Sequence, residues 1–173
     1  MADREVENAS AEVPEIPETL EKVLLFALDE AKDKMGQGTD VIPFTTLVVK
    51  ENLFIETHPG ENAEECFNLA QHTVEGARGA EAYALCYDGY IETDDGVKDA
   101  LIAEGGVPGE ADGYAISYLY EITGDTLKFE DEPAYVGAAP NFMSKLKDAS
   151  EYSDDEIEEK YLEEEEAEGF DEE

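Results

Sequence analysis

The side chains best suited to covalent chemistry are few: the chain has two cysteines, Cys66 and Cys86, and two histidines, His58 and His72. A cysteine nucleophile needs a base within hydrogen-bonding distance. Cys66 and His72 are six residues apart on a predicted helix, so their side chains differ by about 120° in direction. His58 precedes that helix and could reach its first turn, where a thiolate gains from the helix dipole. A Cys66–His58 pair is therefore one hypothesis, and a buried Cys66 with His58 in a turn is the alternative.

Metal and phosphate sites have weaker support in the sequence. Zinc sites need closely spaced Cys and His residues, and the chain contains no such pairs. The segment 104–112 offers Glu104, Glu110 and Asp112, and a turn offers Asp94 and Asp95, but neither matches a calcium-binding loop. The glycines at 105–109 lack the lysine and spacing of phosphate-binding loops. We therefore assign no metal, no cofactor and no catalytic residue.

The most distinctive pattern is aromatic. Tyr114, Tyr118 and Tyr120 alternate along one predicted strand, so they point to the same side, and Tyr83 and Tyr87 form a similar pair on another strand. If the two strands are neighbours, the five side chains could form one binding face, because tyrosine is enriched at interfaces. The alternative is that they pack across strands beneath the helices.

The charge of the chain limits its partners. There are 46 acidic and 11 basic residues, giving a formal net charge of −35. Residues 148–173 contain 15 acids and one lysine, while residues 22–147 still contain 24 acids against nine basic residues. Such a chain repels phosphate backbones and anionic membranes, so we expect no binding to nucleic acid or membrane. A basic peptide or protein is the electrostatically favoured partner, although high charge also simply promotes solubility.

The sequence also suggests a compartment. The segment 1–5 lacks the features of a signal peptide, and no apolar run is long enough to span a membrane. Two cysteines without a close pairing motif fit free thiols in a reducing environment. We expect a cytoplasmic protein.

The elements that would position these residues follow from periodicity. Apolar residues recur at three- and four-residue steps from 19 to 35 and from 63 to 77, which predicts two helices, the second capped by Asn62 with Glu65. Elsewhere the period is two, or the segments are short and β-branched. Strands are predicted at 44–49, 53–57, 82–88, 99–104, 114–122 and 126–130, with a resumption at 134–136 and a short helical turn at 141–146.

These elements predict an α+β fold of order α-β-β-α-β-β-β-β. The short turns favour a largely antiparallel sheet of about six strands, and we expect both helices on one face as a two-layer sandwich. The predicted domain covers residues 18–147. The acidic N-terminal tail (1–17) is expected to be disordered, and the acidic C-terminal tail (148–173) to be disordered or weakly helical.

Three classes of function remain open at this stage. The first is a noncatalytic protein- or ligand-binding module that uses the tyrosine face, with a homodimer as one option. The second is a chaperone-like module for a basic client. The third is a small hydrolase or thiol enzyme built on Cys66 or on the segment 104–112.

Overall fold

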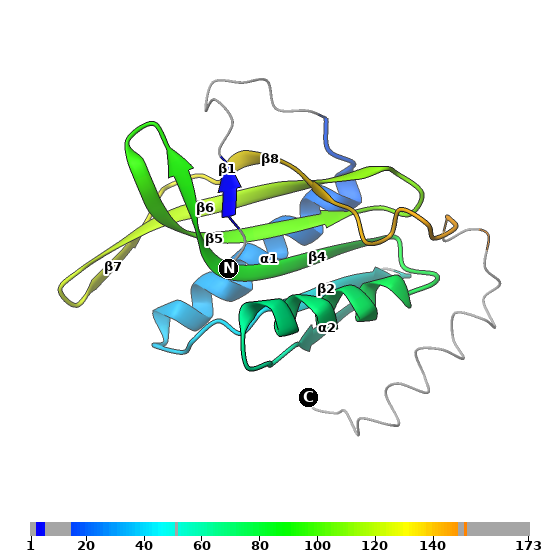
Figure 1. Cartoon of the computed structure of the whole chain (residues 1–173), viewed down its shortest axis with the longest axis horizontal. Helices are drawn as coiled ribbons and strands as arrows, with labels where there is room; N and C mark the ends of the chain where they lie inside the picture. The colour runs from blue at the N-terminus through cyan, green and yellow to red at the C-terminus, as the bar shows by residue number, and fades with distance from the viewer. Residues whose placement is uncertain (1–2, 6–14, 51, 149–150, 152–173) are drawn as a thin grey trace.

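The computed structural model describes residues 3–5, 15–50, 52–148 and 151 of the chain. Two helices and eight strands lie in this part of the chain, in the order shown in Figure 1. The elements are β1 (Asp3–Glu5), α1 (Glu18–Gly36), β2 (Phe44–Val49), β3 (Asn52–Thr57), α2 (Ala63–Glu75), β4 (Ala82–Thr93), β5 (Gly96–Gly106), β6 (Asp112–Thr123), β7 (Thr126–Phe129) and β8 (Ala134–Pro140).

The strands form one sheet in the order β3-β2-β4-β5-β6-β7. All neighbours along this path are antiparallel. β8 is also antiparallel to β6 and pairs with residues 112–117, whereas β7 pairs with residues 120–123. The α+β class, the largely antiparallel sheet and the predicted order of the elements are confirmed. β1 was not predicted, and it adds a short parallel pairing with Tyr90–Glu92 of β4.

The two helices lie on opposite faces of this sheet, which corrects the expectation that they share one face. On β2, Phe44 and Val48 belong to the cluster around α1, whereas Leu47 and Val49 belong to the cluster around α2. Successive side chains of a strand point to opposite faces. Figure 1 accordingly shows α2 in front of the sheet and α1 behind it.

The central strand β4 requires this arrangement. Its residues 82–87 are all buried. Ala82, Ala84 and Cys86 face α1, and Tyr83, Leu85 and Tyr87 face the α2 side. A strand that is apolar on both faces needs cover on both, and burial stabilises by roughly 25 cal/mol per Å² of apolar surface.

The α2 side has a second cover besides its helix. The segment after β8 makes two hydrogen-bonded turns, from Ser144 N–H to Asn141 C=O and from Leu146 N–H to Met143 C=O. Met143 is fully buried there, and Phe142 stacks on Tyr83 with ring centroids 5.8 Å apart. The predicted short turn at 141–146 is thus present and contributes to the core.

The helix ends follow local chemistry. Asn62 caps α2, since its side-chain oxygen accepts a hydrogen bond of 2.8 Å from Glu65 N–H. After α1, Gly38 has φ +79°, the left-handed conformation that glycine adopts without strain. The predicted acidic tails fall mostly outside the described residues.

Two glycines allow the central strands to approach closely. A Cβ at Gly105 would collide with the carbonyl oxygen of Tyr83 on β4, and one at Gly113 would collide with the carbonyl oxygen of Gly105. These contacts are with backbone atoms, which cannot rotate away. The β4–β5–β6 register near this end therefore depends on having no side chain at either position.

We predict that Gly105→Ala lowers the free energy of unfolding by at least about 2 kcal/mol, because the strands must separate or shift to admit the methyl group. Gly36→Ala is the control, since a Cβ at Gly36 meets no atom within 4 Å. It should leave stability unchanged or raise it by about 0.5 kcal/mol. Urea denaturation of both variants measures the difference, and equal midpoints would contradict the prediction.

Candidate functional site

The five tyrosines proposed as one binding face are divided between the two faces of the sheet. Tyr118 and Tyr120 belong to the buried cluster around α1, and Tyr114 packs against that cluster. Tyr83 and Tyr87 belong to the opposite cluster. Four of the five are 9% exposed or less, and Tyr114 is half-buried. The five do not form a single exposed face, because the helices cover both sides of the sheet.

The tyrosine hydroxyls have structural partners. Tyr83 donates to the Pro140 carbonyl at 3.3 Å and accepts from Phe142 N–H at 3.0 Å. Tyr87 donates to the buried carboxylate of Glu104 at 3.4 Å. On the other face, Lys32 of α1 lies 4.0 Å above the Tyr118 ring. The Tyr83 and Tyr118 contacts join the sheet to segments that cover it, and the Tyr87–Glu104 bond joins two neighbouring strands.

Both members of the proposed cysteine–histidine pair are buried. Cys66 is buried on α2, and His58 is 2% exposed after β3. The Nε2 atom of His58 is hydrogen-bonded to the Thr45 hydroxyl at 2.9 Å, so this nitrogen is directed at β2. Cys86 is fully buried, and that burial raises the pKa of its thiol well above the usual range. Cys66 is buried, as the alternative predicted, and Cys86 is buried as well.

Only residues 107–111 of the acidic segment 104–112 lie between strands. Glu104 lies within β5 and is buried, whereas Asp112 begins β6. Within the described ranges, no group of three or more His, Cys, Asp or Glu residues could hold a metal ion.

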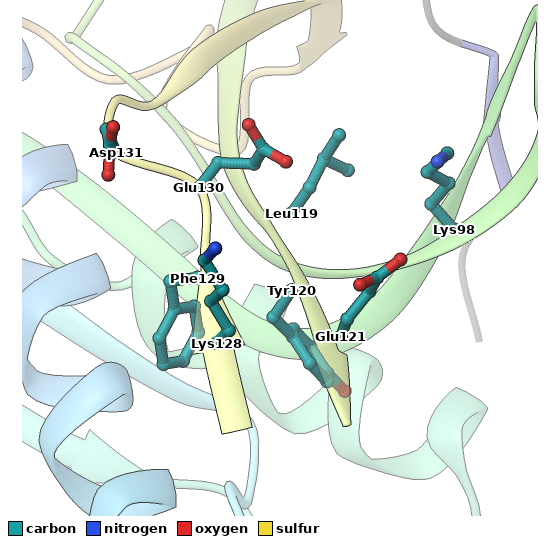
Figure 2. A pocket seen from close by; sticks show the side chains of 8 residues that line it. All are labelled: Lys98, Leu119, Tyr120, Glu121, Lys128, Phe129, Glu130 and Asp131. Carbon is teal, nitrogen blue, oxygen red and sulfur yellow. The ribbon is translucent and has the colours of Figure 1, made fainter. Parts of the chain in front are cut away.

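Two shallow hollows in the described part of the chain lie near the β6–β7 hairpin. The smaller, of about 250 Å³, is lined by side chains of both charges. Figure 2 shows Leu119 and Glu130 on one side of the hairpin and Tyr120 and Phe129 on the other. Its residues are Lys98, Leu119, Tyr120, Glu121, Lys128, Phe129, Glu130 and Asp131.

The larger hollow, of about 560 Å³, has only acidic charges in its lining: Asp40, Asp88 and Asp125. Tyr120 donates a 2.6 Å hydrogen bond to Asp88. The pKa of Asp88 is raised, first because neighbouring atoms remove part of its hydration and then because Asp99 and Asp40 are negative; the bond from Tyr120 opposes this. The lining of this hollow therefore contains three carboxylates and no lysine or arginine.

The surface with the clearest capacity for a partner is the outer edge of β3, which the sequence analysis did not select. β3 ends the sheet, and among the described residues its only strand partner is β2. Two of its large apolar side chains, Leu53 and Ile55, are 44% and 45% exposed, and nearby Ile42 is 43% exposed. We call these three residues and the outer backbone of β3 the β3 edge.

The register shows which backbone groups point outward. Only two residues separate Val49 from its partner Asn52, so this pair exchanges hydrogen bonds and the pattern alternates from there. Two other bonds agree with this phase: Glu81 N–H to Val48 C=O on the β4 side, and His58 N–H to Pro43 C=O on the β3 side. The N–H and C=O groups of Leu53, Ile55 and Thr57 therefore point away from β2, to the open edge.

One sequence signal could have indicated this surface. The six residues of β3, NLFIET, contain one charged residue, in a chain in which a third of the residues are charged. Natural edge strands are usually protected by charges, prolines or bulges. The strand order was needed to recognise that 52–57 is an edge.

Comparisons with known proteins gave no relatives: no family model, curated protein or solved structure matches the chain. In the described ranges, no helix is both long and apolar enough to cross a membrane. The surface must therefore be interpreted from its own geometry.

Burial lowers the pKa of His58 below its ordinary value of 6.5, which predicts a pH-dependent stability. The unfolded chain therefore binds a proton at His58 more readily than the folded chain does. The free energy of unfolding keeps its full contribution from this residue above pH 6.5 and decreases as the pH falls below that value. His58→Gln should reduce this loss between pH 7.5 and 5.5 in urea denaturation. The control His72→Gln, at an exposed helix position, should retain it.

The raised pKa of Asp88 predicts the opposite dependence of stability on pH. The folded state holds this proton more tightly, so ionisation costs stability as the pH rises above the ordinary value of 3.8. Asp88→Asn keeps an acceptor for the Tyr120 hydroxyl and removes that cost. We expect the variant to be more stable than the natural chain at pH 7 and equal to it near pH 3. A variant less stable at pH 7 would contradict the prediction.

Proposed function

We propose that this chain is a noncatalytic protein-binding module that takes up an extended segment of a partner along the β3 edge. The observation that carries the proposal is an edge strand that pairs with β2 alone among the described residues, and whose outward backbone groups at Leu53, Ile55 and Thr57 lie next to exposed apolar side chains. This is the arrangement used in strand addition, where backbone hydrogen bonds supply affinity and alternate side chains supply specificity.

The chemistry of the edge suits a strand rather than a small ligand. Leu53, Ile55 and Thr57 each offer one N–H donor and one C=O acceptor at the spacing of a neighbouring strand. Leu53 and Ile55 lie on the same face, because they pair with Val48 and Thr46. An added strand would cover both side chains with its own alternate residues.

The other candidate groups in the molecule have structural roles, which leaves the β3 edge as the surface for binding. The tyrosines, both cysteines, His58 and Glu104 have core positions or structural partners, as described above. The net charge of −35 disfavours nucleic acid as the partner and favours protein segments that are not acidic.

The test removes one outward donor. Ile55→Pro deletes an N–H that points away from β2, a position where an edge strand tolerates proline. Ile55→Ala is the matched control, because it shortens the same side chain and keeps the N–H group. Random twelve-residue peptides displayed on phage are selected on the full chain, and the affinities of the winners are measured by fluorescence anisotropy.

We expect selected peptides to lose at least tenfold in affinity for Ile55→Pro and about threefold for Ile55→Ala. In the natural chain, hydrogen exchange at the amides of Leu53, Ile55 and Thr57 should slow on binding. That second measurement stays informative if Ile55→Pro fails to fold. Selection that yields no binder, or binders that leave these amides unprotected, would refute the proposed function.

A further inference from the structure

We infer that the segment taken up at the β3 edge has apolar side chains at every second residue, all directed to the α1 side of the sheet, with polar side chains between them. This inference rests on the proposed function and adds the sequence pattern that the partner must have. It follows from the different character of the two rows of side chains along β3.

The row on the α1 side is apolar and exposed. Leu53 and Ile55 pair with Val48 and Thr46 of β2, and paired residues of antiparallel strands point to the same face. Val48 belongs to the cluster around α1, so Leu53 and Ile55 lie on the face that α1 covers farther along the sheet. They remain 44% and 45% exposed there. We call these two side chains the apolar row.

The row on the α2 side has a different character. Asn52 and Glu56 are polar and exposed, and Phe54 between them is already packed against the cluster around α2. An apolar side chain of a partner would therefore gain less on this face than against the apolar row. Polar side chains of a partner can keep their contact with water here, which avoids the cost of burying them.

The backbone bonds select the same partner residues as the apolar row. The N–H and C=O groups of Leu53, Ile55 and Thr57 point to the open edge. In an antiparallel addition, a partner residue that exchanges bonds with one of them lies directly opposite it, and its side chain points to the same face. Alternate partner residues therefore bind the backbone of β3 and also cover the apolar row.

The width of the uncovered surface favours an extended segment over a helix. On the α1 side of β2, Phe44 and Thr46 are fully buried and Val48 is 8% exposed, so the exposed apolar strip is one strand wide. A helix with its side chains is about 10 Å across, whereas neighbouring strands lie about 4.8 Å apart. A helix would extend beyond the strip, whereas the alternate side chains of a strand match its width.

A second copy of the chain is the less favourable occupant, although its own β3 contains the required pattern in Leu53 and Ile55. It would bring another net charge of −35 to the interface. At physiological salt the screening length is about 8 Å, and surfaces in contact lie within that distance, so two copies repel each other. Charge complementarity therefore favours a separate segment that carries no acidic residues.

Two synthetic peptides of the same composition and charge test the inference on the full chain. The alternating probe is Ac-KTITITITK-amide, and the period-three probe is Ac-KITTITTIK-amide. The alternating probe can place three isoleucines opposite Leu53, Ile55 and Thr57, whereas the period-three probe can place only one there. Both probes carry the same two lysines, so the ratio of their affinities reports the pattern of apolar residues and not the charge.

Two protein variants distinguish the faces of β3. Leu53→Thr/Ile55→Thr removes the apolar row on the α1 side and keeps every N–H group of the strand. Asn52→Thr/Glu56→Thr is the matched control, because it changes two residues of the same strand on the α2 side. All four side chains are exposed, so we expect both variants to fold.

We expect the alternating probe to bind the natural chain about fivefold more tightly than the period-three probe, because two further isoleucines form cross-strand pairs with β3. Leu53→Thr/Ile55→Thr should abolish this preference, and the control variant should keep it. In the natural chain, nuclear Overhauser contacts should join the isoleucine methyl groups of the alternating probe to Leu53 and Ile55 and not to the Phe54 ring. That measurement stays informative if Leu53→Thr/Ile55→Thr fails to fold.

Three results would overturn the inference and leave the proposed function standing. The first is equal binding of the two probes that still requires the Ile55 N–H, as measured with Ile55→Pro. The second is a preference for the alternating probe that survives Leu53→Thr/Ile55→Thr. The third is a set of methyl contacts to Phe54 in place of Leu53 and Ile55, which would put the isoleucines on the α2 side.

The remaining outcomes concern binding itself and other occupants. If neither probe slows hydrogen exchange at the amides of Leu53, Ile55 and Thr57, the proposed function fails together with the inference. If these amides are protected without peptide, and the protection is lost on dilution, a second copy occupies the edge. Protection that does not change on dilution would instead indicate a segment of the same chain. Either result overturns the inference.

Discussion

Strand β4 is apolar on both of its faces, and the rest of the structure depends on covering both. One face carries small residues, which let α1 approach the sheet closely, and the other carries Tyr83, Leu85 and Tyr87. The long α1 covers the first face. The shorter α2 leaves part of the second, and the turns after β8 cover that part with Phe142 and Met143.

This constraint determines which parts of the surface remain for function. With both faces of the sheet covered, four of the five tyrosines become core residues, and the Tyr83 hydroxyl joins the sheet to the segment after β8. The surface left for a partner is then that of the edges, the loops and the outer helix faces. Of the two sheet edges, β3 presents exposed apolar side chains and an alternating row of outward backbone groups, and that combination is the reason for proposing strand addition there.

Local features were predictable from the sequence because they depend on neighbours in the chain. The period of the apolar residues predicted both helices and the strands, and the predicted helix cap at Asn62 is confirmed. The relation between helices and faces was not predictable in the same way. Alternation along β2 and β4 shows that both sides are apolar, but it does not say which helix packs on which side. The β3 edge was missed for a related reason, since an edge is defined by strand order and 52–57 has the composition of any half-buried strand.

The acidity of the chain and the exposed β3 edge are consistent with one physical arrangement. An unprotected edge strand invites pairing with identical edges, and most proteins prevent this with a local lysine, proline or bulge. Here the net charge of −35 supplies a repulsion between copies that acts as the surfaces approach. The same field attracts a basic segment. A chain with this charge can therefore keep an apolar edge open to a partner of opposite charge while it discourages its own copies, and a local lysine on the edge would remove that discrimination.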